Sequence, residues 1–212
     1  MAGLNPEEAR IFRITHIDNV PWILDHGIHC TKSRVQDPNF IPIGKQEVID
    51  KRRNHPVEIG PCGTLGDYVP FYFTPWSIMM YYIKTGYGGV TKRPNQDIAI
   101  LVSSIPRLIV LGRRFLFTSA AAYFHEAEYF EDAKHLKQID WKLLQSRNFK
   151  TDPDDPGKQG RYHAEALVHQ HMPLEGLLGM ACYDLSAKAR LDAEVKRRNL
   201  SLTVKVISNW YF

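Results

Sequence analysis

One carboxylate of this chain has surroundings that suit chemistry. Glu165 lies within residues 164–168, an apolar run that the sequence predicts to be a short strand, and alanines on either side leave room beside it. A glutamate inside an apolar strand is uncommon. Glu165 either faces solvent from a half-exposed strand or acts as a catalytic carboxylate that stabilises a developing positive charge.

An aromatic segment is a second candidate. Residues 67–77 read DYVPFYFTPWS, a β-prone run that ends in Thr-Pro, and a helix is predicted over residues 75–84. Ser77 would stand in the first turn of that helix. The aromatic side chains of the run could line a slot for a flat ring; they are Tyr68, Phe71, Tyr72 and Phe73. The alternative is a core strand with ordinary aromatic packing.

Two further segments carry polar and basic groups. Residues 13–19 (RITHIDN) join a strand predicted over residues 11–16 to a helix that is capped by Asp18 or Asn19 and ends at Gly27. After a polar loop over residues 32–44, a helix is predicted over residues 45–54. It ends in Lys51-Arg52-Arg53, a place where the helix dipole alone would favour arginine.

Composition limits the class of protein. The chain has 212 residues and a net charge of +4, a mild excess that is compatible with a nucleic-acid partner. No apolar run reaches the roughly 18 residues of a membrane span, and the first eight residues lack the pattern of a signal peptide. The cysteines, Cys30, Cys62 and Cys182, have no metal-ligand spacing. We therefore expect a cytoplasmic protein with reduced thiols, no metal and no membrane contact.

Short strands and a few helices follow one another along the chain. Further strands are predicted at residues 98–102, 115–118, 178–183 and 202–207, and a helix at residues 186–199 with Ser186 as its N-cap. Without repeats or linkers, the pattern predicts one α+β domain over residues 1–212. No Rossmann Gly-x-Gly-x-x-Gly follows a strand and no Walker-type Gly-Lys-Ser/Thr occurs, so hydride transfer and P-loop chemistry lack support.

Together, residues 13–19, 67–77 and 162–168 resemble segments of the DarT family, toxins that ADP-ribosylate DNA with NAD+ as the donor. The resemblance runs from Ile11 to the C-terminal Asn-Trp-Tyr-Phe. It implies the ADP-ribosyltransferase fold, an α+β architecture with two small packed β-sheets around an NAD-binding cleft and flanking helices. It also implies that NAD+ is the co-substrate and that nicotinamide is released.

The resemblance assigns catalytic roles to two residues. Glu165 matches the family's catalytic glutamate, which would hold a ribose hydroxyl and stabilise the cationic transition state. Arg53 matches an essential arginine of the family better than Arg52 does, and it would contact both NAD+ and the target base.

The family holds the nicotinamide end of NAD+ at the strand edge around Thr15. The implied NAD+-binding residues are Arg13, Ile14, Thr15, His16, Asn19, Arg53, Tyr72 and Ser77. Arg13 departs from the family, which often has histidine there, and a permanently charged arginine could pair with a phosphate. His16 could equally be a structural histidine.

The segment that reads the target base is altered. Many members have aspartate and histidine where this chain has Ser119 and Ala121, so guanine is as plausible a target as thymine. A basic groove between residues 119–160 and 51–53 would hold single-stranded DNA, with bases stacked on aromatic rings. The implied DNA-binding residues are Ser119, Ala121, Tyr123, Phe149 and Arg161.

The resemblance implies a toxin whose partner is an antitoxin that removes ADP-ribose from DNA. Two alternatives stay open on the sequence. One is an ADP-ribosyltransferase that acts on RNA or protein, and the other is a non-catalytic nucleic-acid-binding module that would use the basic clusters without Glu165.

Overall fold

The computed structural model describes residues 4–212. Residues 1–3 lie outside the described residues, and so does that part of the N-terminal segment in which the sequence predicts no signal peptide. Within residues 4–212, no helix has both the length and the apolar character that crossing a bilayer requires.

A mixed sheet of eight strands forms the centre of the molecule, in the order β10-β9-β4-β1-β3-β7-β5-β6. Its pairs are antiparallel except for β10 and β9, which run parallel. The strands are β1 (Arg10–His16), β3 (Tyr68–Tyr72), β4 (Ile98–Ser104), β5 (Phe115–Thr118), β6 (Tyr129–Phe130), β7 (Glu165–His169), β9 (Gly179–Cys182) and β10 (Val204–Val206). A separate two-stranded sheet pairs β2 (Ile28–His29) with β8 (His171–Met172).

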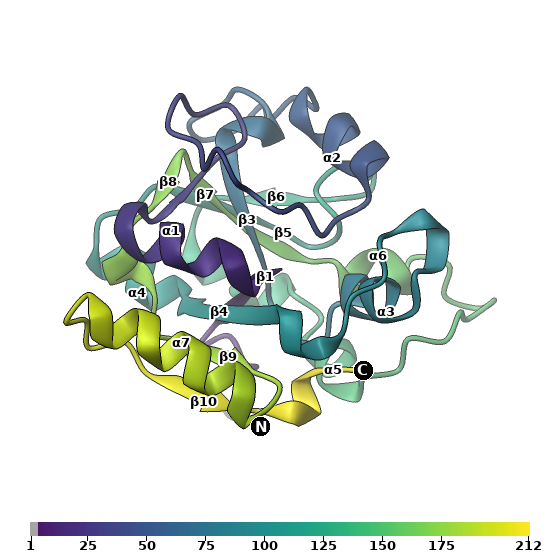
Figure 1. The fold of residues 1–212 in the computed structure, drawn as a ribbon. Helices are drawn as coiled ribbons and strands as arrows, with labels where there is room; N and C mark the ends of the chain where they lie inside the picture. Colours follow the sequence, from purple (N-terminus) through teal and green to yellow (C-terminus); the bar gives the residue numbers. More distant parts are fainter. Residues whose placement is uncertain (1–3) are drawn as a thin grey trace.

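Helices surround the large sheet (Figure 1). They are α1 (Val20–His26), α2 (Gln46–Arg53), α3 (Ile78–Thr85), α4 (Ile105–Val110), α5 (Trp141–Ser146), α6 (Lys158–Tyr162) and α7 (Leu185–Arg197). Helices α1 and α7 lie together on one side, whereas α2 stands at the top of the view, beyond the strands. The prediction of an α+β fold with two sheets is confirmed, and the two sheets are unequal in size.

The aromatic strand β3 is mostly core. Tyr68, Phe71 and Phe73 are buried, and Phe73 packs edge-on against Phe117 and Trp141. The prediction that these three rings line a ligand slot is therefore wrong. Among these rings only Tyr72 keeps partial exposure. Phe71 points to the opposite face of the strand, and Tyr68, on the same face as Tyr72, is covered by a second core cluster.

Two helix boundaries differ from the predictions. Helix α3 begins after Ser77, whose hydroxyl caps it by accepting from the N–H of Met79, because Trp76 is instead buried and donates to the carbonyl of Asn209. Helix α7 is capped by Asp184 rather than by Ser186, since the Asp184 carboxylate accepts from the N–H of Ala187.

Candidate active site

Glu165 is buried, and its carboxylate accepts three hydrogen bonds. It is the first residue of β7, lies opposite Tyr72 in the β3–β7 register, and is 2% exposed. Arg52 donates from Nη1 to Oε1 and from Nη2 to Oε2, each at 2.7 Å. The backbone N–H of Ala122 donates to Oε1 at 2.8 Å. The carboxylate of Glu165 can stay charged although it is buried, because the bidentate ion pair replaces the hydrogen bonds that it loses from water.

Arg52 stays charged in this pair. Burial opposes the guanidinium charge, but the charge of Glu165 and its hydrogen bonds outweigh that effect and raise the pKa of Arg52. The ring of Tyr123 lies beneath the guanidinium, 5.9 Å from its centre. This geometry allows a cation–π contact.

Tyr129 contacts Glu165 indirectly, through the peptide group of Ala122. Its hydroxyl donates to the carbonyl of Ala122, whose N–H donates in turn to Glu165. Burial, reinforced by the charge of Glu165, raises the pKa of Tyr129 to about 12. The phenol is therefore protonated at neutral pH and remains a donor, which fixes the Ala122 peptide toward the carboxylate.

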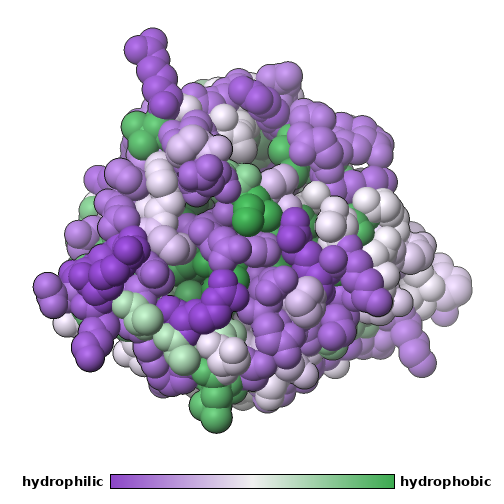
Figure 2. Space-filling view, in the orientation of Figure 1, coloured by the Kyte–Doolittle hydropathy of each residue, from purple (hydrophilic) through white to green (hydrophobic). Residues whose placement is uncertain are grey.

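A cavity of about 340 Å³ opens on the other side of α2. Its walls come from β1, α1, the loop that follows β2, and α2. The lining residues are Arg13, Thr15, Asn19, Trp22, Ile23, Ile28, His29, Thr31, Gln36, Asp37, Phe40, Pro42, Gln46, Ile49, Asp50 and Arg53. The face of the molecule drawn in Figure 2 is mostly hydrophilic, with hydrophobic patches near its centre and at its lower edge.

Asn19 ties the cavity walls together. Its amide donates to Thr15 Oγ1 at 3.2 Å and to the carbonyl of Ile41 at 2.9 Å, and it accepts from the N–H of Ile41 at 2.8 Å. Because Ile41 belongs to the long loop and Thr15 to β1, one buried side chain holds the loop against the sheet.

Arg13 brings positive charge to the cavity wall. Its Nη1 donates to the carbonyl of Pro70 at 2.9 Å. Burial lowers the pKa of Arg13 to about 10, with Tyr72 opposing the shift and Arg52 adding to it. The side chain is still a cation at neutral pH.

The expected NAD+-binding residues fall into two groups. Arg13, Thr15, Asn19 and Arg53 line the cavity. The others do not line it: Ile14 packs against the core, His16 caps a turn by accepting from the N–H of Asp18, Ser77 caps α3, and Tyr72 lies opposite Glu165. The hydrogen bond of His16 is the structural role that the sequence had left open.

Two adjacent arginines of α2 point to different sites, one to Glu165 and the other to the cavity. Arg52 contacts Glu165, whereas Arg53 lines the cavity. The partner of Glu165 is thus Arg52, which the sequence did not single out, while the role of Arg53 toward NAD+ and the target base stays a prediction. Successive helical residues point about 100° apart, so only one of them can face the carboxylate.

The expected DNA-binding residues are spread out. Tyr123 is partly exposed beside Arg52. Ser119 accepts from the N–H of Glu128, and Ala121 is buried with its N–H donating to the carbonyl of Gly160. Both therefore serve the fold of the loop between β5 and β6.

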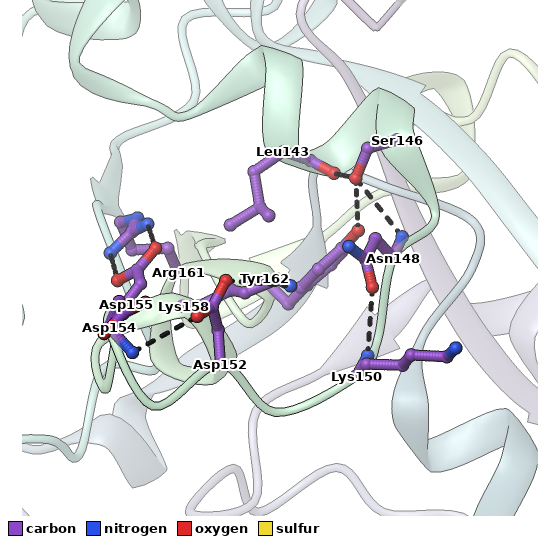
Figure 3. Close-up of polar contacts among 10 residues, drawn as sticks. All are labelled: Leu143, Ser146, Asn148, Lys150, Asp152, Asp154, Asp155, Lys158, Arg161 and Tyr162. Carbon is purple, nitrogen blue, oxygen red and sulfur yellow. Dashed lines mark hydrogen bonds and ion pairs between the residues drawn. The ribbon is translucent and has the colours of Figure 1, made fainter.

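Phe149 and Arg161 are engaged elsewhere. Phe149 packs on Tyr162 and Phe212, with ring centres 4.8 and 5.3 Å apart. Arg161 makes a bidentate pair with Asp155 (Figure 3). It also donates from Nε to Asp140. Intramolecular partners hold this ring and this cation in the structure, and their contact with DNA stays a prediction.

Comparison with known proteins identifies relatives along nearly the whole chain. The family model described as "ssDNA thymidine ADP-ribosyltransferase, DarT" matches residues 12–212. A DNA ADP-ribosyl transferase of Escherichia coli O127:H6 (strain E2348/69 / EPEC) is 49% identical over 211 residues, which cover 100% of this chain and 97% of that protein.

Solved structures agree with the sequence relatives. Thermus sp. 2.9 DarT in complex with ADP-ribosylated ssDNA superposes with a TM-score of 0.90 at 28% identity, covering 98% of both chains. The same protein in complex with NAD+ gives a TM-score of 0.82 at 26% identity, covering 98% of this chain and 99% of that one. A Thermosipho africanus (strain H17ap60334) relative, 24% identical over 92% of this chain and 48% of its own length, is a DNA ADP-ribosyl transferase–DNA ADP-ribosyl glycohydrolase fusion protein.

Proposed function

The chain belongs to the DarT family of NAD+-using DNA ADP-ribosyltransferases, and we propose that it transfers ADP-ribose to a base of single-stranded DNA as the toxin of a toxin–antitoxin pair. The observation that carries the proposal is the buried Glu165–Arg52 pair, which α2 connects to the cavity lined by Arg13 and Arg53.

The cavity has the properties that a dinucleotide needs. Its volume of about 340 Å³ lies within the range of small-molecule sites. Arg13 and Arg53 supply two cations for phosphate groups, and Trp22 and Phe40 supply flat apolar surface. We infer that NAD+ binds here, with Thr15 and Asn19 at its nicotinamide end.

Glu165 would act on the ribose that loses nicotinamide. A carboxylate next to the anomeric carbon stabilises the positive charge that develops as the carbon–nitrogen bond breaks. In the structure both carboxylate oxygens accept from Arg52. Oε1 accepts a second bond from Ala122, whereas Oε2 accepts from Arg52 alone, so a ribose hydroxyl can donate to the remaining lone pair of Oε2 while the ion pair stays intact.

The target base is guanine or thymine in this proposal. The family description names thymidine. However, Ala121 has no polar side-chain group and Ser119 already accepts from Glu128, so neither offers the charged or imidazole contact of other members. A site that lacks a hydrogen-bonding group loses discrimination between bases.

The remaining parts of the proposal concern context. A relative that fuses the transferase to a DNA ADP-ribosyl glycohydrolase supports an antitoxin partner that removes ADP-ribose from DNA. We place the enzyme in the cytoplasm, where NAD+ and DNA meet, as one catalytic domain over residues 1–212.

Mass spectrometry tests the proposal directly. The protein is incubated with NAD+ and single-stranded oligonucleotides of varied sequence, and the DNA is digested to nucleosides. We expect an ADP-ribosylated deoxyguanosine or thymidine product from the wild type. Glu165→Ala should reduce the rate by about a hundredfold to a thousandfold and leave NAD+ binding in place.

Glu175→Ala, at an exposed carboxylate on another element, is the matched control and should keep full activity. Parallel reactions with RNA and with protein complete the design. Adducts on RNA or protein with none on DNA would reject the proposed substrate, and an active Glu165→Ala variant would reject the assigned carboxylate.

A further inference from the structure

His163 lies beside the catalytic pair and has no part in the contacts described so far. It follows α6 as its C-cap, two residues before Glu165, and its backbone N–H donates to the carbonyl of Gly160 at 3.0 Å. Its ring meets the ring of Tyr72 edge-on, with centres 6.2 Å apart. Because Tyr72 lies opposite Glu165 in the β3–β7 register, this contact places the imidazole next to the carboxylate.

The imidazole is open to a ligand. His163 is partly exposed, and within residues 4–212 neither ring nitrogen is buried without a partner or hydrogen-bonded to another residue. Three other histidines differ in this respect: His16 accepts from the N–H of Asp18, and the rings of His29 and His171 contact the carbonyl of His26.

The charge state of His163 suits a proton acceptor. Burial lowers its pKa below the ordinary value; Glu165 opposes this shift, and Arg52 adds to it. The ring is therefore neutral at pH 7 and has a free lone pair. Arg52, Glu165 and Tyr72 are the titratable groups that face it.

The other titratable groups near Glu165 are poorer proton acceptors. Glu165 is occupied by Arg52 and by the N–H of Ala122. Arg13 and Arg52 are cations, and burial together with the Glu165 charge raises the pKa values of Tyr72 and Tyr129, which keeps these phenols protonated. Among the described titratable groups around Glu165, His163 is thus the neutral base.

We propose that His163 is a catalytic residue that accepts the proton of the attacking base nitrogen. This inference rests on the proposed function. As the base nitrogen bonds to the anomeric carbon, the bond from that carbon to nicotinamide breaks and its electron pair leaves with nicotinamide. The proton of the base nitrogen passes to a ring nitrogen of His163 and then to solvent.

The test compares His163→Ala and His163→Gln with His169→Ala. His169 is the matched control, because it ends the same strand β7 and packs on Tyr68, four residues along the strand from Glu165. General-base catalysis is typically worth roughly 10²–10⁴-fold, so both His163 variants should lose at least about a hundredfold in kcat. The Kd for NAD+, followed by intrinsic tryptophan fluorescence to which the cavity residue Trp22 contributes, should change less than about twofold.

Two readouts distinguish a proton acceptor from a structural residue. Added imidazole should restore part of the kcat of His163→Ala and none in His169→Ala. Because burial lowers the pKa of His163, the wild-type kcat should fall along an acid limb that lies below the ordinary histidine value of about 6.5, and this limb should disappear in the His163 variants. Thermal unfolding checks the fold, and His163→Gln carries the test if His163→Ala does not fold.

Wild-type protein that modifies DNA, together with His163 variants of equal activity, would overturn this inference alone. Lost activity with neither imidazole rescue nor a changed acid limb would also overturn it, since His163 would then be structural. Wild-type protein that never modifies DNA would overturn the proposed function and this inference with it.

Discussion

At the scale of single residues, two neighbouring arginines have different environments. Arg52 has a side chain that is 18% exposed and pairs with a carboxylate that is 2% exposed. Arg53 is exposed and lines the cavity. Their loss should therefore change different quantities.

Arg52→Ala should lower both stability and turnover. Removing one partner of a buried pair leaves Glu165 with only the N–H of Ala122, at a cost of roughly 3 kcal/mol in the free energy of unfolding. Because the carboxylate is no longer oriented, kcat should fall by about a hundredfold. Arg53→Ala should instead raise the KM for NAD+ about tenfold, which corresponds to about 1.4 kcal/mol, and leave stability nearly unchanged.

Urea unfolding and steady-state kinetics of the two variants measure these effects. Glu47→Ala is the control, because Glu47 is exposed on the same helix and its ion pairs are with Lys45 and Lys51. If Arg53→Ala is the variant that loses stability and kcat, the roles of the two arginines are reversed.

At the scale of secondary-structure elements, α2 is weakly attached. None of its residues is buried. It is held by the Arg52–Glu165 pair and by the hydroxyl of Thr64, which donates to the carbonyl of Arg53 at 2.9 Å. A helix without buried apolar contacts belongs to the low-stability end of a protein.

We expect NAD+ to protect α2 from hydrogen exchange. The backbone amides of residues 46–53 should exchange rapidly in the free protein and slow by about tenfold or more when the cavity is filled, because the bound ligand contacts α2. Mass spectrometry of exchanged peptides measures this. Helix α7, which buries Ala187, Leu191 and Val195, is the internal control and should not change. Equal exchange of residues 46–53 with and without NAD+ would place the ligand elsewhere.

At the scale of the whole molecule, several histidines make the fold sensitive to acid. Burial, the largest cause in each case, lowers the pKa values of His16, His29, His163 and His169. Below about pH 6.5 the unfolded chain then binds more protons than the folded chain, so stability falls as the pH falls. Carboxylates with lowered pKa values, such as Asp184 and Glu194, change the stability only at lower pH, where they become protonated.

The free energy of unfolding should therefore decrease by on the order of 1–3 kcal/mol between about pH 7 and pH 5. Urea titrations at intermediate pH values measure the decrease. His169→Asn should make the slope shallower, since one group with a lowered pKa is gone. A free energy of unfolding that is constant or rises over this interval would contradict the assignment.

Local patterns of the sequence determined a large part of this protein. Helix α2, the strand that carries Glu165 and the polar block of β1 were predicted from periodicity and capping, because these features depend on neighbours in the chain. Glu165 was singled out for the same reason, since a lone carboxylate in an apolar strand is visible in the sequence itself.

Tertiary packing alone decided which side chains meet. Arg52 and Glu165 are 113 residues apart in the chain, and no local pattern indicates which of two adjacent arginines faces the carboxylate. Arg161 and Phe149 looked free in the sequence, but Asp155 and Tyr162 hold them. No sequence pattern indicates a role for His163. Its proposed role depends on a neutral ring placed beside Glu165, and that placement follows from the register of β3 and β7 and the position of α6.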